Sequence, residues 1–429
     1  MIIIFYTVIF AAFLNACNGA GGGCFPGGGC FGGGADENFD IDEFEYQGDP
    51  IKFACISNPS QNQFDITDVN GHIPPGLISS LHNGKGLSLF FYGVANEVDS
   101  TFDSLLQYIK EWSAKSQNNI CVVFYSYAMN SSEVLKMYPI VNKMVKTRRL
   151  EYVAKMARDL VFGVRAKCLA TTERTCLRNL SQVDVTGFSF GAHIAGRTCQ
   201  YLLRKTGERV RLLLALDPIK TPRFGPKIKN SINKGDANYV QVIHTSKKVG
   251  MWDQMGDVDI YVKNAKQDNL GFLNDEHGIA FFIHLGTSTK RLFIWVRENG
   301  NGSVWTRNGK ELDDECTIGV YSTLKSQHRG KKLNLYLKNA NLENFWRGIG
   351  SFNMAELFLG AHDVELEERI SIETDCSICS ENKKNVLLLP SNHNEICMTC
   401  WNNWKNTPSS GSRCPYCRQK VTSAVEVNK

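Results

Sequence analysis

The sequence predicts an α/β fold built on a mostly parallel central sheet, followed by a small cysteine-rich module. Between residues 87 and 245, short apolar runs alternate with amphipathic stretches, which is the order of strands joined by covering helices. The chain has 429 residues, 43% hydrophobic and 21% charged, which is enough for two or three folded domains. Six of the 15 cysteines fall in the last 54 residues, where they predict the separate module.

The first residues predict a targeting segment. Ile2–Leu14 is an unbroken apolar run of 13 residues, followed by small residues. A membrane-spanning helix needs about 20 apolar residues, so a permanent anchor is less favoured than a cleavable signal peptide over residues 1–20. We therefore expect a secreted protein or one of the secretory pathway; the alternative is a cytoplasmic protein, if this segment is not used as a signal.

Two linkers are expected to divide the chain. Residues 21–49 combine a glycine-rich tract with an acidic stretch, and residues 351–375 hold seven acids and one arginine. Neither composition can bury a core. The folded parts should then be 50–350 and 376–420. Within the larger part, Cys168 and Cys176 are close enough in sequence to close a short disulfide loop.

The strands and helices of the larger part follow from its periodicity. The first helix, from about Thr101, places its apolar residues on one face behind a possible N-cap at Ser100. A long helical stretch covers 139–166, a third helix starts at Gly191, and the pattern after 290 is strand-rich. Strands are predicted at 87–94, 120–127, 183–188, 212–217 and 239–245.

The charge of the chain is unevenly distributed. The net charge is +5, but residues 51–350 hold 40 basic against 26 acidic residues. This excess is dense between Lys136 and Lys167 and suits an anionic membrane surface or nucleic acid. The alternative for that stretch is a solvated helix face. We expect no specific nucleic-acid partner.

The clearest chemical motif is Gly187-Phe188-Ser189-Phe190-Gly191, which lies directly between a predicted strand and a predicted helix. A nucleophile elbow needs such a tight turn, flanked by glycines, to expose its serine hydroxyl above the sheet. Ser189 is therefore the candidate nucleophile. The backbone N–H of Phe190 would line the oxyanion hole at the helix N-terminus.

An acid and a base should follow the nucleophile in chain order. Asp217 ends the apolar run LLLALD and fits the acid. His277 lies in the polar segment NDEHG before a helical run and is the predicted base, with His284, inside that run, as the alternative. His193 on the elbow helix and His244 inside a strand are expected to be structural.

These residues resemble the neutral lipases related to pancreatic lipase, including the sn-1 phospholipases of insects and vertebrates. The similarity covers about 300 residues and rests on five segments: GFSFGAHIAG, LALDP, DANYVQVIHT, GDVDIYVKN and HGIAFFIHLGTST. It implies an α/β-hydrolase fold with Ser189, Asp217 and His277 as the catalytic triad. It also implies that Val94 supplies the second oxyanion N–H, although Tyr92-Gly93 stands where the family usually has His-Gly.

The resemblance further implies a lipase or phospholipase that needs no cofactor for hydrolysis. Its substrate would be a lipid at a membrane or lipoprotein surface. Only about a dozen residues separate Asn264 from His277, where the family has its lid. Short lids in this family accompany phospholipid substrates.

The tail resembles a RING finger, in which interleaved ligand pairs bind two zinc ions. Its spacing is C-S-I-C, S-N-H, C-M-T-C and C-P-Y-C, and such closely spaced thiolate pairs are zinc ligands. One or two ions are expected, because Ser391 replaces the usual cysteine of the second site. A set of disulfides is the alternative. The resemblance assigns Cys376, Cys379, Cys397 and Cys400 to the first ion, and His393, Cys414 and Cys417 to the second.

A RING finger implies a second function class. Ile378, Trp404 and Pro415 occupy the positions at which RING ligases contact a ubiquitin-conjugating enzyme. The alternative to a lipid ester hydrolase is therefore a RING-type ubiquitin ligase whose lipase-like body is a binding platform. The hydrolase is the principal prediction.

Overall fold

The computed structural model divides the chain into two compact units, Met1–Asn353 and Met354–Lys429. We call the first unit the body and the second the C-terminal unit. The described residues are 40–93, 103–127, 137–171, 176–220, 228, 230–247, 249–263 and 276–350, together with 352, 386–389, 393–406, 412–414 and 420–426. The predicted signal peptide and, apart from residue 352, the linker predicted over 351–375 lie outside them.

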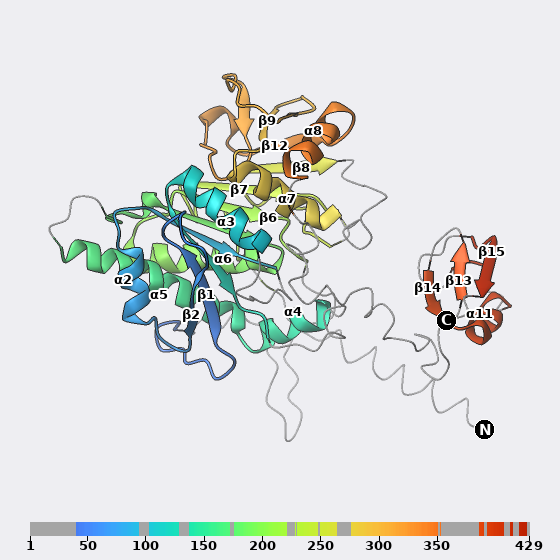
Figure 1. The fold of residues 1–429 in the computed structure, drawn as a ribbon, viewed down its shortest axis with the longest axis horizontal. Coiled ribbons are helices and arrows are strands. Elements are labelled where there is room, and N and C mark those ends of the chain that lie inside the picture. The colour runs from blue at the N-terminus through green and yellow to red at the C-terminus, as the bar shows by residue number, and fades with distance from the viewer. Residues whose placement is uncertain are drawn as a thin grey trace, which may run out of the picture. The chain divides into compact units, whose positions relative to one another are not determined.

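The body is organised around one nine-stranded sheet of order β12-β8-β7-β6-β5-β3-β4-β1-β2 (Figure 1). From β12 to β4 every neighbouring pair is parallel, while β1 pairs antiparallel with β4 and β2. The predicted mostly parallel sheet is thus confirmed. The strands are β1 (Ile51–Ile56), β2 (Asp65–Val69), β3 (Leu87–Phe91), β4 (Asn119–Phe124), β5 (Val183–Phe188), β6 (Leu212–Leu216), β7 (Tyr239–His244), β8 (Val258–Lys263) and β12 (Lys331–Tyr336).

Helices cover both faces of this sheet, as its fully buried central strands require. On one face α5 packs on α6 and α2, and on the other α3 packs on α7. Among the helices within the described ranges, none combines the length and the apolarity that crossing a bilayer requires. The helices are α2 (Pro75–Leu81), α3 (Asp103–Ser116), α4 (Met137–Lys146), α5 (Arg149–Leu169), α6 (Phe190–Thr206), α7 (Glu276–Ser288) and α8 (Ala340–Ile349).

The long helical stretch expected over 139–166 is confirmed, but the structure divides it into α4 and α5. Arg148 adopts a left-handed conformation with φ of 56° between them. The turn lets the fully buried Arg149 reach backbone carbonyls of Tyr125 and Asp49. Helical periodicity continues through the break, so the sequence pattern does not reveal it.

The acidic linker expected over 21–49 is wrong in its last part, because residues 40–49 lie against α5. Asp42 forms ion pairs with Arg158 at 2.6 Å and with Lys205 at 3.0 Å, and these cations hold the pKa of its carboxyl below the usual value. Tyr46 stacks on Tyr152 with ring centroids 4.3 Å apart. The segment folds because its acids and aromatic rings match the basic, apolar side of α5.

The described residues of the body also contain two disulfides and a small second sheet. Cys55 and Cys121 are register partners on β1 and β4 and are bonded to each other; Cys168 and Cys176 form the second bond, as their spacing predicted. A three-stranded antiparallel sheet of order β10-β9-β11 packs beside β12 and α8. Its strands are β9 (Phe293–Arg297), β10 (Ser303–Trp305) and β11 (Glu315–Thr317).

Within its described residues, the C-terminal unit consists of a small antiparallel sheet and the helix α11. Its strands have the order β14-β13-β15, and α11 (Met398–Lys405) follows β14 directly. Its buried core contains only a few side chains, among them Trp401, Cys397 and Cys414. The strands are β13 (Val386–Leu389), β14 (His393–Ile396) and β15 (Ser423–Glu426).

An aromatic cluster fills the space between the sheet and the helices α3 and α7. Phe90 of β3 contacts Trp112 of α3 and both Phe281 and His284 of α7. His284 is fully buried there, and neither ring nitrogen has a hydrogen-bond partner among the described residues. Burial lowers the pKa of His284 to about 3. It is therefore a neutral part of the core, and the alternative that made it the base is not supported.

We expect His284 to make the body sensitive to acid. Between pH 6.5 and 3 the unfolded chain binds a proton at this position that the folded chain excludes, so the free energy of unfolding falls as the pH falls, by about 1.4 kcal/mol per pH unit. His284→Leu should flatten this dependence, measured by urea unfolding across that range. His72→Leu is the control, because His72 is exposed. An unchanged slope in His284→Leu would refute the assignment.

Candidate active site

Ser189 sits in a strained turn between β5 and α6. Its φ of 59° and ψ of −122° are unusual for a residue with a side chain. A Cβ on Gly187 would lie 2.1 Å from the Gly191 carbonyl oxygen, and one on Gly191 would lie 2.4 Å from the carbonyl oxygens of Phe91 and Tyr92. Both positions therefore require glycine, and helix α6 is held tightly against the end of β3.

The structure brings Ser189, Asp217 and His277 into one hydrogen-bonded array. The distance from His277 Nε2 to Ser189 Oγ is 2.8 Å, and that from His277 Nδ1 to Asp217 Oδ2 is 2.6 Å. A carboxylate only accepts, so Nδ1 carries the ring proton and Nε2 accepts the proton of the Ser189 hydroxyl. This is the arrangement of a serine nucleophile with its general base and orienting acid.

Backbone groups fix the carboxylate of Asp217. Its Oδ1 atom accepts hydrogen bonds from the Thr245 N–H at 2.7 Å and from the Ser246 N–H at 3.2 Å. Asp217 has a φ of 42° and its N–H donates to the Ile243 carbonyl. With one oxygen held by the loop after β7, the other is directed at His277.

Gly250 is a site residue that the sequence analysis missed. A Cβ at this position would lie 2.4 Å from Asp217 Oδ1 and 2.5 Å from Oδ2. Only the absence of a side chain lets the loop pass so close to the carboxylate. Nothing in the sequence marks Gly250, since it lies in a loop with no motif around it.

The other predicted histidines have structural partners. His193 of α6 bonds to Ser231 Oγ at 2.6 Å and to the Ile219 carbonyl at 2.8 Å, and burial lowers its pKa to about 4. His244 bonds to Asp259 at 3.0 Å in the interior. His193 thus ties the elbow helix to the segment after Asp217, in agreement with the structural role expected of it.

Of the two predicted oxyanion donors, Phe190 and Val94, only Phe190 is among the described residues. Phe190 is the first residue of α6, where N–H groups have no intrahelical acceptor and point toward the positive end of the helix dipole. Val94 lies outside the described residues. The preceding Tyr92 is buried, and its carbonyl oxygen accepts a 2.6 Å hydrogen bond from the Tyr125 hydroxyl.

Three of the predicted zinc ligands are described with their side chains. Cys397 and Cys414 are buried in the core of the C-terminal unit and Cys400 is half-buried. The Cys397 sulfur accepts the Cys400 backbone N–H at 3.4 Å, as a thiolate ligand does. Buried sulfurs in so small a core suit a metal-bound module. His393 begins β14, but its side chain lies outside the described residues, as do Cys376, Cys379, Ser391 and Cys417.

Comparison with known proteins identifies both parts. Residues 101–271 match the Lipase family model, and residues 372–424 match the model of the C3HC4-type zinc finger, the RING finger. The chain is therefore similar to lipases over residues 101–271 and to RING fingers over residues 372–424. Both resemblances drawn from the sequence are therefore confirmed. The lipase match includes Ser189 and Asp217, while His277 lies just beyond it.

The curated relatives each match only part of this chain. A phospholipase A1 of the wasp Vespula squamosa is 32% identical over 123 residues, which is 28% of this chain and 40% of the relative. Vitellogenin-3 of Drosophila melanogaster is 35% identical over 80 residues, 18% of this chain and 19% of its own length. The chain thus spans less than half of either relative.

The solved structures that resemble the chain include a carboxylesterase and a lipase, both of low sequence identity. A thermostable carboxylesterase cloned from a metagenomic library aligns over 41% of this chain and 49% of its own, at 15% identity and a TM-score of 0.22. A hormone-sensitive lipase from a metagenome library aligns over 43% and 52%, at 13% identity and a TM-score of 0.21. The body itself has the mostly parallel sheet and the strand-to-helix elbow of an α/β-hydrolase.

Adding one methyl group at Gly250 should impair the site. Gly250→Ala forces the Asp217 carboxylate away from His277, and a displacement of about 1 Å can cost roughly 100-fold in rate. The measurement is the rate of Ser189 labelling by a fluorophosphonate. Gly76→Ala is the control, because nothing lies within 4 Å of the added carbon. Equal labelling rates for both folded variants would contradict the role given to Gly250.

Proposed function

We propose that the body hydrolyses carboxylic esters of lipids, as a lipase or phospholipase, through a Ser189–His277–Asp217 triad. The observation that supports this most is the pair of short hydrogen bonds that links the three side chains. All three are nearly or fully buried, so their geometry is fixed by packing before substrate binds, as catalysis by pre-organised groups requires.

The reaction is an acyl transfer in two steps. His277 Nε2 takes the Ser189 proton while Oγ attacks the ester carbonyl carbon, and the departing alcohol receives that proton from His277. The acyl group is then bonded to Ser189. In the second step His277 takes a proton from water, the hydroxide attacks the acyl carbon, and the fatty acid leaves as Ser189 regains its proton. Asp217 stabilises the imidazolium formed in each step.

The oxyanion of each tetrahedral intermediate needs donors already in place. The Phe190 N–H at the start of α6 is the first, and the Val94 N–H after β3 is the second. Gly191 packs against the end of β3, which brings the strand that leads to Val94 beside the elbow. Removing one donor of this kind costs about 100- to 1,000-fold in kcat.

Phospholipid is the substrate class we favour. The wasp relative is a phospholipase A1, and the segment before His277 is short for a lid that would bury a whole triacylglycerol. The protein would act in the secretory pathway or outside the cell. The apolar N-terminal run and the two disulfides of the body support this address.

Ser189→Ala should abolish ester hydrolysis. The loss should be several orders of magnitude in kcat/KM on a phospholipid, because removing the nucleophile disables the whole triad. Covalent labelling by a fluorescent fluorophosphonate should vanish with it. Ser181→Ala, an exposed serine in the same region, is the matched control and should label normally. A folded wild-type protein that is not labelled by the probe and releases no fatty acid would refute the proposal.

A second candidate function rests on the RING match at residues 372–424. Cys376, Cys379, Cys397 and Cys400 would hold one zinc ion, and His393, Cys414 and Cys417 a second, weaker one beside Ser391. Bound zinc would supply about 10 to 16 kcal/mol of folding free energy to a unit with so small a core. A ubiquitin-conjugating enzyme is the partner that this module fits, and ligase activity is the alternative function.

Treatment with a chelator should distinguish a zinc-bound tail from a tail held by disulfides. A strong chelator should make the residues after about 372 sensitive to protease and leave the body intact, and zinc should restore their resistance. Cys414→Ser should lower the zinc content per chain, measured by elemental mass spectrometry, while Ser189→Ala leaves it unchanged. A tail that resists the chelator and opens only with a thiol reductant would instead contain disulfides.

A further inference from the structure

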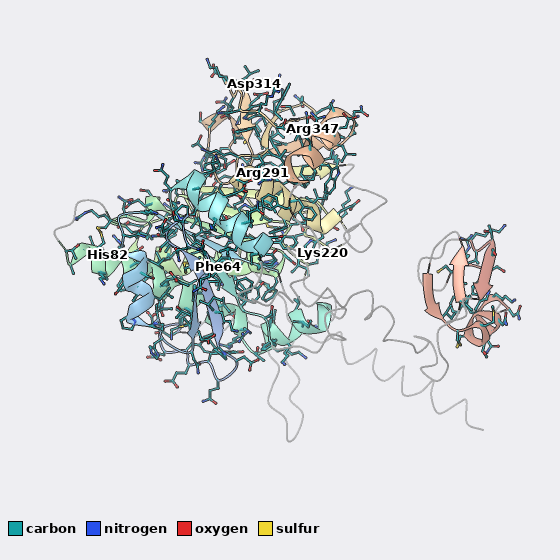
Figure 2. The ribbon with its side chains drawn as sticks, in the orientation of Figure 1. Phe64, His82, Lys220, Arg291, Asp314 and Arg347 are labelled. Carbon is teal, nitrogen blue, oxygen red and sulfur yellow. A yellow bond between two sulfur atoms is a disulfide. The ribbon has the colours of Figure 1, made fainter. Side chains whose placement is uncertain are left out.

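Four lysines lie at the carboxyl edge of the sheet, where the triad is also found. Each belongs to one of four neighbouring parallel strands or follows it within a few residues. We call this group the lysine rim: Lys220 after β6, Lys247 after β7, Lys263 at the end of β8 and Lys338 after β12. Figure 2 shows Lys220 at this end of the sheet and His82, which precedes β3, at the other.

The rim brings like charges together around aromatic rings. Lys263 and Lys338 both lie 5.4 Å from the centroid of the Tyr336 ring. The Lys220 ammonium donates a hydrogen bond to the Lys247 carbonyl, and the Lys247 ammonium lies 5.2 Å from the Trp252 ring. Each pair of positive charges is held close by backbone and ring contacts, which raises the local positive potential.

No carboxylate of the described residues forms an ion pair with a rim lysine. The described acids on this edge include the exposed Asp253, the half-buried Glu276 at the start of α7, and Asp217, which is hydrogen-bonded to His277. Some lysines elsewhere in the body are neutralised: Lys205 pairs with Asp42, Lys325 with Glu311 and Lys331 with Glu298. The rim thus keeps a positive surface beside Ser189.

We propose that the lysine rim docks the enzyme on membranes that carry anionic phospholipid head groups. This rests on the proposed lipid hydrolysis and names the surface on which it occurs. Lysines near an anionic leaflet are attracted to it, while tryptophan and tyrosine favour the level of the head groups. Trp252 and Tyr336, both half-buried, provide such rings between the lysines. Docking through this edge presents the triad to the membrane.

The position of the rim on the same edge of the sheet as the triad favours a membrane, rather than nucleic acid, as its partner. Phosphate backbones would also attract lysines, but they contain no carboxylic ester for the adjoining site to cleave. The rim extends from β6, next to the elbow strand β5, through β7 and β8 to β12. A membrane docked on the rim would present its lipid esters to the edge of the sheet on which Ser189 lies.

The test is vesicle co-sedimentation of the full chain carrying Ser189→Ala, so that lipid is not consumed. Vesicles of phosphatidylcholine are compared with vesicles that also contain phosphatidylglycerol. The variant Lys247→Gln/Lys338→Gln removes two exposed rim charges. The control Lys115→Gln/Lys234→Gln removes two exposed charges near the amino ends of β4 and β7, at the opposite edge. The rim variant should bind anionic vesicles about 25-fold more weakly, roughly fivefold per lysine, and the control as wild type.

Equal binding by the rim and control variants would overturn the proposal, as would equal binding of wild type to both kinds of vesicle. Tighter binding to duplex DNA than to anionic vesicles, lost in the rim variant, would assign the surface to nucleic acid instead. Turnover of p-nitrophenyl butyrate by wild type tests the hydrolase separately. If that activity is missing while rim-dependent vesicle binding persists, the proposed function fails and the docking surface stands.

Discussion

The turn at Ser189 is the constraint on which the rest of the body depends. Its flanking glycines are in contact with backbone, so the elbow has no space in which to relax. The Ser189 N–H donates a hydrogen bond to the Leu216 carbonyl, and the Ser189 carbonyl accepts one from the Ile219 N–H. These two partners lie on either side of Asp217. Serine and acid are therefore parts of one backbone unit, and only the base has to arrive from a distant helix.

Features of the fold and the site that depend on a local residue pattern could be predicted from the sequence. Strands buried on both faces appear as uninterrupted apolar runs, and Ser189 and Asp217 each follow one directly, so both could be located from the sequence. His277 was identified from its polar setting before an apolar helix. Gly250, Thr245 and Ser246 act on Asp217 through backbone proximity alone. Such contacts depend on how a loop folds in space, and residue types do not encode them.

The departures from the predicted fold have the same origin. The break at Arg148 depends on the partners that Arg149 finds on another part of the chain. The docking of residues 40–49 depends on ion pairs with residues more than a hundred positions away. The two cysteine populations were separable from spacing alone, because metal ligands come in close pairs whereas the Cys55–Cys121 bond joins neighbouring strands.

Arg149 has a consequence for where the hydrolase body begins. Its guanidinium is buried and donates to the Asp49 and Pro50 carbonyls and to the Tyr46 hydroxyl. A chain cut at residue 50 would leave that cation in the interior with some of its acceptors removed, which is a large cost. The folded body therefore includes residues 40–49, and any proteolytic cut that leaves it intact must lie upstream of them. The hydrogen-bond acceptors that buried Arg149 requires extend the folded body to about ten residues before the start at residue 50 that was predicted from composition.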